Sequence, residues 1–163
     1  MRRPASILAI SLAILSLSSY VGATQKITPV RWLVKNAPAK PIRPGAKFTI
    51  ILEAAIDPGW HLYALEEPKG GPTATEIALT EGDATDLLRV EQSKPKVLPD
   101  PVFQQPTGFF ETTAAFTLHL ELAPDAAPGA HTLHVLAKYQ SCNDRLCLPP
   151  HIDTIEIPIT AGK

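Results

Sequence analysis

Hydrophobic and polar residues alternate along several separate stretches of the chain. In residues 48–56, apolar side chains occupy every second position, and the same period of two recurs in residues 116–122, 133–139 and 152–159. A period of two places alternate side chains on opposite faces of an extended chain, so each stretch predicts a β-strand with one buried face.

Shorter extended segments are expected around these four. Residues 27–34, 60–65 and 73–80 each have strand composition and are separated by turn residues such as Asp57-Pro58-Gly59. Consecutive strands usually pair with one another. About seven to nine short strands without an amphipathic helix predict an all-β protein, an immunoglobulin-like antiparallel β-sandwich.

The middle of the chain has a weaker pattern. Residues 85–92 alternate poorly, and the next stretch contains four prolines, which are incompatible with a long regular strand. These are Pro95, Pro99, Pro101 and Pro106. Irregular chain of this length in a compact domain is usually functional cover, so residues 94–110 are expected to form a lid.

Length, charge and the N-terminus limit the interpretation further. Residues 1–23 combine Arg2 and Arg3 with an apolar stretch and end in Val-Gly-Ala, which is typical of a cleaved signal peptide; a retained anchor is the alternative. Residues 24–163 then form one exported domain, expected in the periplasm. The net charge of −1 provides no basic surface for nucleic acid.

The candidate chemistry lies in the two cysteines, Cys142 and Cys147, which have only four residues between them. Asn143-Asp144 is typical of a turn, so the pair is expected at the tip of a hairpin-like loop. A structural disulfide is the default interpretation in a small exported domain. However, closing a ring of about six residues stabilises a fold by only about 2 kcal/mol, against about 4.7 kcal/mol for a ring of about a hundred. A short ring therefore favours exchange chemistry over stapling.

A metal site is a third interpretation of the same residues. Cys142, Cys147, His151 and His134 could supply four ligands. Their spacing matches no usual zinc pattern, and the prolines before His151 would hold its ring away. The sequence therefore predicts no metal and no small-molecule cofactor, and it contains no hydrolase, kinase or Cys-x-x-Cys motif.

The cysteine segment resembles a known family. Tyr139-Gln140-Ser141-Cys142 followed by Cys147-Leu148-Pro149-Pro150 is similar to the active-site segment of the N-terminal periplasmic domain of DsbD, the thiol:disulfide interchange protein. Pro58 to Tyr63 resembles that family's early strand motif, and Gly108 to Glu111 falls where its mid-domain loop and strand would lie. The resemblance covers residues 27–159 and implies the same immunoglobulin-like fold.

The resemblance also implies roles for individual residues. Cys147 would form the mixed disulfide with partners and Cys142 would resolve it, as a component of a protein-disulfide reductase. A cap loop carrying an aromatic residue would cover the disulfide. The candidates are Phe103, Phe109 and Phe110, of which Phe103 is preferred because prolines and glutamines surround it. Some family members have five residues between the cysteines instead of four, so the direction of electron flow does not carry over.

These inferences lead to one expected function and one alternative. The expected function is thiol–disulfide exchange with periplasmic thioredoxin-fold proteins. Full-length DsbD continues into a membrane domain and a thioredoxin-like domain, so the electron donor is expected to be a membrane protein encoded separately. The alternative is a non-enzymatic immunoglobulin-like interaction domain with a structural disulfide.

Overall fold

The computed structural model describes residues 27–163, so the predicted signal peptide lies outside the described residues. Eleven β-strands and the loops between them make up this part of the chain. Among these residues there is no helix with the length and apolar character needed to span a membrane.

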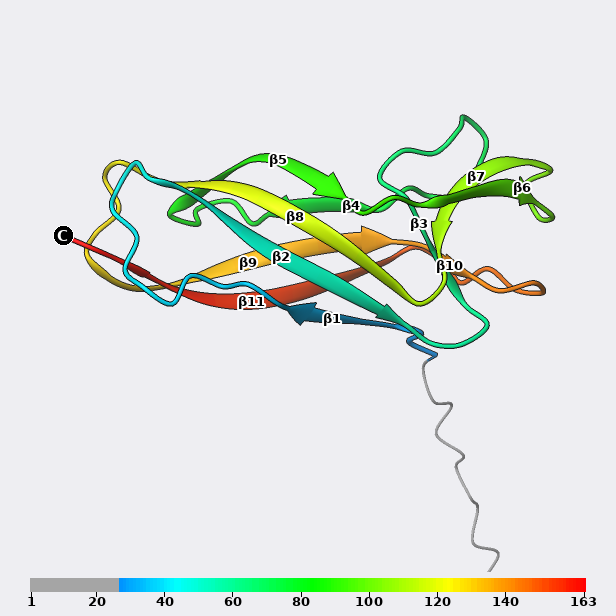
Figure 1. Ribbon diagram of the computed structural model, residues 1–163, viewed down its shortest axis with the longest axis horizontal. Helices are drawn as coiled ribbons and strands as arrows, with labels where there is room; N and C mark the ends of the chain where they lie inside the picture. The colour runs from blue at the N-terminus through cyan, green and yellow to red at the C-terminus, as the bar shows by residue number, and fades with distance from the viewer. Residues whose placement is uncertain (1–26) are drawn as a thin grey trace, which may run out of the picture.

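Two antiparallel sheets pack face to face as a sandwich (Figure 1). The first has four strands in the order β1-β2-β8-β5, with bounds Val30–Val34, Lys47–Ile56, Thr113–Leu122 and Thr85–Gln92. The second has three strands in the order β11-β9-β4, with bounds His151–Ala161, Gly129–Tyr139 and Glu76–Leu79. The predicted all-β, immunoglobulin-like antiparallel sandwich is confirmed.

A third, smaller sheet lies at one end of the sandwich (Figure 1). Its strand order is β10-β3-β7-β6, with bounds Ser141–Cys142, His61–Tyr63, Gln105–Phe110 and Lys96–Asp100. Strand β10 follows directly on β9, so the second main sheet leads straight into the cysteine segment. This end of the molecule therefore carries the candidate site.

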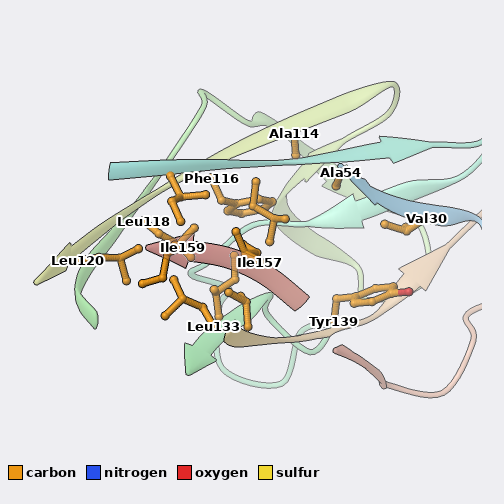
Figure 2. Packing of buried hydrophobic residues seen from close by; sticks show 14 of the residues in the cluster. Val30, Ala54, Ala114, Phe116, Leu118, Leu120, Leu133, Tyr139, Ile157 and Ile159 are labelled. Atoms are coloured by element: carbon orange, nitrogen blue, oxygen red, sulfur yellow. The ribbon is translucent and has the colours of Figure 1, made fainter. Parts of the chain in front are cut away.

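The core between the two main sheets is aliphatic and contains few aromatic rings (Figure 2). Strand β8 contributes Phe116, Leu118 and Leu120, all fully buried, from the alternating positions that the sequence identified. Leu133 on β9 and Ile157 on β11 meet them from the opposite sheet. Burying one such side chain is worth about 1.5–3 kcal/mol, so this core contributes strongly to the stability of the fold.

The expectation that residues 94–110 are irregular is largely wrong, because most of this stretch forms the β6–β7 hairpin. Two prolines that argued against a strand, Pro99 and Pro106, lie directly opposite each other in this hairpin. Pro99 lies on β6, which is the edge strand of this sheet. Pro106 lies on β7, and β3 pairs with β7 only at Phe109 and Phe110. Neither proline therefore has to donate a backbone hydrogen bond to a further strand. Only the tip of the hairpin is irregular.

Other differences concern the pairing and length of strands. Residues 85–92 form the regular strand β5, with one register shift against β8 between Leu87 and Arg89. Strands β2, β3 and β4 are consecutive but pair with other partners, against the expectation that neighbours in sequence pair. Strand β3 is shorter than the predicted 60–65, although the Ala64 N–H still donates to the carbonyl of Gly108 on β7.

Candidate functional site

The two cysteines form a disulfide across a tight hairpin. Their sulfurs are 2.02 Å apart, and Cys142 and Cys147 face each other as an antiparallel bridge with Cα atoms 4.1 Å apart. Asn143 shapes the turn: its N–H donates to the carbonyl of Leu146 (2.9 Å), and its Oδ1 accepts the N–H groups of Arg145 and Leu146 at 2.9 and 2.8 Å. The hairpin-like loop expected from Asn143-Asp144 is therefore present.

The two cysteines differ in their access to solvent. Cys142 belongs to strand β10 and is 0% exposed, whereas Cys147 lies on the returning arm and is half-buried. Leu146, directly before Cys147, is 47% exposed. A second molecule can therefore reach the sulfur of Cys147 more easily than that of Cys142.

Strand β3 supports the disulfide from the side. Cys142 is the register partner of His61, and Ser141 is the partner of Leu62. Register partners project from the same face of a sheet, so the His61 ring lies on the disulfide side. The His61 Nε2 atom is 3.3 Å from the Tyr63 hydroxyl, and its ring packs against Phe109 at 5.1 Å between centroids.

Burial lowers the pKa of the His61 imidazole below its ordinary value, and three carboxylates act in the opposite direction. They belong to Asp100, Asp144 and Glu111. The disulfide therefore has a neutral, half-buried imidazole as its neighbour at neutral pH.

A buried carboxylate, that of Asp100, organises the tip of the β6–β7 hairpin. It accepts four hydrogen bonds, two from backbone N–H groups of the tip and two from hydroxyls of neighbouring strands. The donors are Val102 N (2.8 Å), Phe103 N (3.2 Å), Tyr63 Oη (2.9 Å) and Thr107 Oγ1 (3.3 Å). The tip is thus tied to β3, the strand that supports the disulfide.

These contacts shift the pKa values of both partners. Burial alone raises the pKa of Asp100, but the hydrogen bonds from Phe103, Val102 and the two hydroxyls outweigh it and lower the pKa below its ordinary value. Burial and the hydrogen bond to Asp100 raise the pKa of Tyr63 far above that of a free tyrosine. Tyr63 therefore stays neutral and donates, and Asp100 stays ionised and accepts.

A half-buried carboxylate, that of Glu67, joins the end of β3 to β7. Glu67 Oε1 accepts the N–H groups of Ala64 and Gly108 at 3.1 and 3.2 Å. Burial raises the pKa of Glu67 in spite of these bonds. A side chain at Gly108 would be crowded, because an added Cβ would lie 3.1 Å from the Cβ of Ala64.

The three candidate cap residues occupy different positions. Phe103 lies at the hairpin tip and packs edge-on against Tyr63, with ring centroids 6.1 Å apart. Phe109 contacts His61, and Phe110 is 5% exposed in the core against Phe116. Both the hairpin tip and the disulfide loop extend from the same end of the sandwich (Figure 1).

Sequence reasoning did not identify the polar network of Tyr63, Asp100 and Glu67. The only available signal was the Pro58 to Tyr63 motif, which contains Tyr63; nothing local indicated that Asp100 is buried.

His134, one of the four candidate ligands in the metal interpretation, does not lie with the cysteines as a ligand set. Its Nδ1 atom is 3.0 Å from the carboxylate of Asp83. Within residues 27–163, no three His, Cys, Asp or Glu side chains are arranged to hold a metal ion.

The fold and site define a β-sandwich with a hairpin disulfide supported by a small end sheet. The chain belongs to the family described as thiol:disulfide interchange protein DsbD, N-terminal, whose model matches residues 30–158. The family predicted from the cysteine segment is therefore confirmed. No curated protein sequence matches the chain.

Two solved structures are similar to this fold. The N-terminal domain of DsbD from Neisseria meningitidis, in its reduced form, matches with a TM-score of 0.51 and 15% identity, covering 81% of this chain and 86% of that one. At this identity the likeness shows the fold alone. AggA, the major subunit of aggregative adherence fimbriae type I from Escherichia coli, matches with a TM-score of 0.36 and 9% identity over 82% and 95% of the two chains, too weak a likeness to argue from.

The Asp100 network predicts a pH-dependent contribution to stability. Because the pKa of Asp100 is lowered by folding, the ionised form stabilises the fold above the ordinary carboxyl pKa, and this contribution is lost as pH falls through the folded pKa. Asp100→Asn should therefore lower the free energy of unfolding by about 1–3 kcal/mol at about pH 7, and by clearly less at about pH 3. Denaturant unfolding at both pH values measures the difference.

The matched control is Asp125→Asn, because Asp125 is an exposed carboxylate in the β8–β9 loop. It should change stability by less than about 0.5 kcal/mol at either pH. An equal loss for Asp100→Asn at both pH values would contradict the role given to its charge.

Proposed function

We propose that this protein is a thiol–disulfide exchange module that passes reducing equivalents through the Cys142–Cys147 pair. The observation that supports it best is the unequal access of the two cysteines, with Cys142 fully buried and Cys147 partly exposed on a hairpin at the end of the sandwich. Membership of the DsbD N-terminal family agrees with this function. A bridge whose ring is this short restrains the unfolded chain little, which favours chemistry over stapling.

The exchange proceeds in two balanced steps. A partner thiolate attacks Cys147 Sγ, a partner–Cys147 bond forms, the Cys142–Cys147 bond breaks, and Cys142 leaves as a thiolate that then takes a proton. A second thiol of the partner attacks its own bonded sulfur and releases Cys147, so the partner leaves oxidised and the pair reduced. In reverse, Cys147 attacks an oxidised partner and Cys142 resolves the mixed disulfide.

Partners and location follow from the family. The proposed partners are thioredoxin-like proteins of the periplasm and a membrane electron donor, and the proposed location is the periplasm, where the family's N-terminal domain is found. Neither the direction of electron flow nor a cofactor is part of the proposal. Residues 24–163 are proposed to form the mature domain.

Phe103 is proposed as the cap residue. Its backbone N–H is held by Asp100 and its ring packs against Tyr63, two residues along β3 from His61. His61 in turn is the register partner of Cys142. These contacts tie the hairpin tip to β3, the strand that carries the register partner of Cys142, and so support a shielding role for Phe103.

The reduction potential of the disulfide tests the proposed function. Structural disulfides have potentials below about −300 mV, and exchange disulfides titrate well above that value. We expect the Cys142–Cys147 pair to titrate above about −250 mV in glutathione or dithiothreitol buffers, read by alkylation and intact mass. A potential below about −300 mV would support the interaction-domain alternative, with which the full burial of Cys142 is also compatible.

Trapping experiments test the different roles of the two cysteines. A periplasmic thioredoxin-fold protein with a single cysteine, activated as its thionitrobenzoate mixed disulfide, accepts one incoming thiolate and releases a coloured thiol. Cys142→Ser, which keeps the accessible Cys147, should form the covalent complex about tenfold faster or more than Cys147→Ser. In denaturant the two variants should react alike, and equal rates in the folded state would refute the assignment.

Removing the cap side chain should expose the disulfide. Phe103→Ala should speed reduction of the wild-type bond by dithiothreitol several-fold, because the shielding ring is lost while the Asp100 bonds to the backbone remain. Val102→Ala is the matched control, since that side chain is 50% exposed in the same loop. Similar reduction rates for both variants and the wild type would count against Phe103 as the cap.

A further inference from the structure

Cys142 is enclosed by protein and cannot exchange its proton with water directly. The residue is 0% exposed, yet the proposed exchange requires its thiol to lose a proton when it attacks and to regain one when it leaves. Burial in an apolar environment raises the pKa of a thiol, so the reactive thiolate is scarce at neutral pH. The resolving step therefore needs a neighbouring group that accepts the proton.

His61 is the side chain that the end sheet places beside Cys142. The two residues are register partners in the pairing of β10 with β3, so their side chains project to the same face with Cβ atoms about 4.5–5.5 Å apart. Tyr63 and Phe109 flank the imidazole on this face, with ring centroids 5.4 and 5.1 Å from it. These two rings hold the imidazole in position.

The Asp100 network determines which ring nitrogen of His61 carries the proton. The ionised Asp100 carboxylate can only accept, so the Tyr63 hydroxyl uses its hydrogen in the 2.9 Å bond to Asp100. The Tyr63 oxygen can then only accept from His61 Nε2, which is 3.3 Å away, so Nε2 carries the N–H. In the neutral ring the free lone pair is therefore on Nδ1. Within residues 27–163, Nδ1 has no hydrogen-bond partner.

The imidazole is in the form that can take a proton, and it can pass that proton on. Burial holds the pKa of His61 below its ordinary value, although three carboxylates oppose this effect. They are those of Asp100 on β6, Asp144 in the cysteine loop and Glu111 after β7. The ring is half-buried and lines a pocket of about 390 Å³ together with Glu111 and Asp144. It can therefore exchange protons with water on one side and with the buried sulfur on the other.

We propose that His61 is the proton acceptor for Cys142 in the exchange reaction. When Cys147 holds an oxidised partner in a mixed disulfide, the Cys142 S–H proton moves to His61 Nδ1 and the Cys142 thiolate attacks Cys147 Sγ. The Cys142–Cys147 bond forms, the partner–Cys147 bond breaks, and the partner leaves as a thiolate. The partner is then reduced and the cysteine pair oxidised, and the imidazolium releases its proton to water. In the reverse direction, the imidazolium returns the proton to Cys142 as that sulfur leaves.

This inference rests on the proposed exchange function, and a two-step reaction isolates the step that it concerns. The reduced protein reacts with the symmetrical disulfide of thionitrobenzoate, and each step releases one coloured thiolate. The first step forms a mixed disulfide at Cys147, and its rate is proportional to the reagent concentration. The second step is the attack by Cys142, and its rate does not depend on the reagent concentration. Rapid mixing measures both rates.

His61→Phe keeps an aromatic ring against Tyr63 and Phe109 but cannot accept a proton. At about pH 7 it should slow the second step about tenfold or more, because only a few per cent of an unassisted thiol is ionised, and it should leave the first step unchanged. In the wild type the second rate should level off above the folded pKa of His61. In the variant it should keep rising towards the pKa of the thiol, so the two rates converge at about pH 9.

Two further variants complete the design. His61→Gln keeps an N–H that can donate to Tyr63 but accepts no proton at neutral pH, so it should slow the second step as His61→Phe does. His131→Phe is the matched control, because His131 lies near the start of β9, at the opposite end of that strand from the cysteine segment. It should leave both rates and their pH dependence unchanged.

The outcomes separate this inference from the function on which it rests. Second-step rates in both His61 variants equal to that of the wild type would overturn the role of His61 and leave disulfide exchange standing. A slowing that is the same at every pH would also overturn it, because such a change reports altered packing and not proton transfer. A wild type without a concentration-independent second step would overturn both proposals, because Cys142 then does not resolve the mixed disulfide.

Discussion

The end of the molecule that carries the disulfide depends on one buried charge, the carboxylate of Asp100. A buried carboxylate is costly unless donors surround it, and here two backbone N–H groups and two hydroxyls do so. The four donors come from three separate elements, so satisfying the charge fixes the hairpin tip against β3 and β7. The position of Phe103, and through Tyr63 the surroundings of His61, follow from this one electrostatic requirement.

Stability and chemistry are carried by different parts of the chain. The two main sheets bury an aliphatic core that is fully excluded from solvent at positions such as Leu118 and Leu133. The disulfide closes a ring of few residues at the far end and therefore contributes little to that stability. In the proposed exchange function, the bond opens and closes while the sandwich remains folded, because the core lies apart from the bridge. A domain with a small core and a long-range bridge would not have this freedom.

The sequence was informative where local pattern determines structure. Alternation located β2, β8 and β9, and turn chemistry at Asn143 located the cysteine hairpin. The prediction from the sequence was wrong for the β6–β7 hairpin. Whether a strand tolerates Pro99 or Pro106 depends on which strand edges stay unpaired, and this is known only once the sheet is assembled. Asp100 was missed for the same reason: an aspartate beside a proline is typical of an exposed turn, and only the donors brought by β3 and β7 make its burial favourable.

The short pairing of β10 with β3 connects the two faces of the site. Side chains alternate along a strand, so Cys142 projects with His61 to one face and Ser141 projects with Leu62 to the other. A slip of one residue in this register would exchange the two faces and place the hydroxyl where the sulfur now lies. Leu62 prevents such a slip, because it is fully buried in the core and pairs on its other side with Phe110. The core thus sets the register that keeps the disulfide on the His61 face of this strand pair.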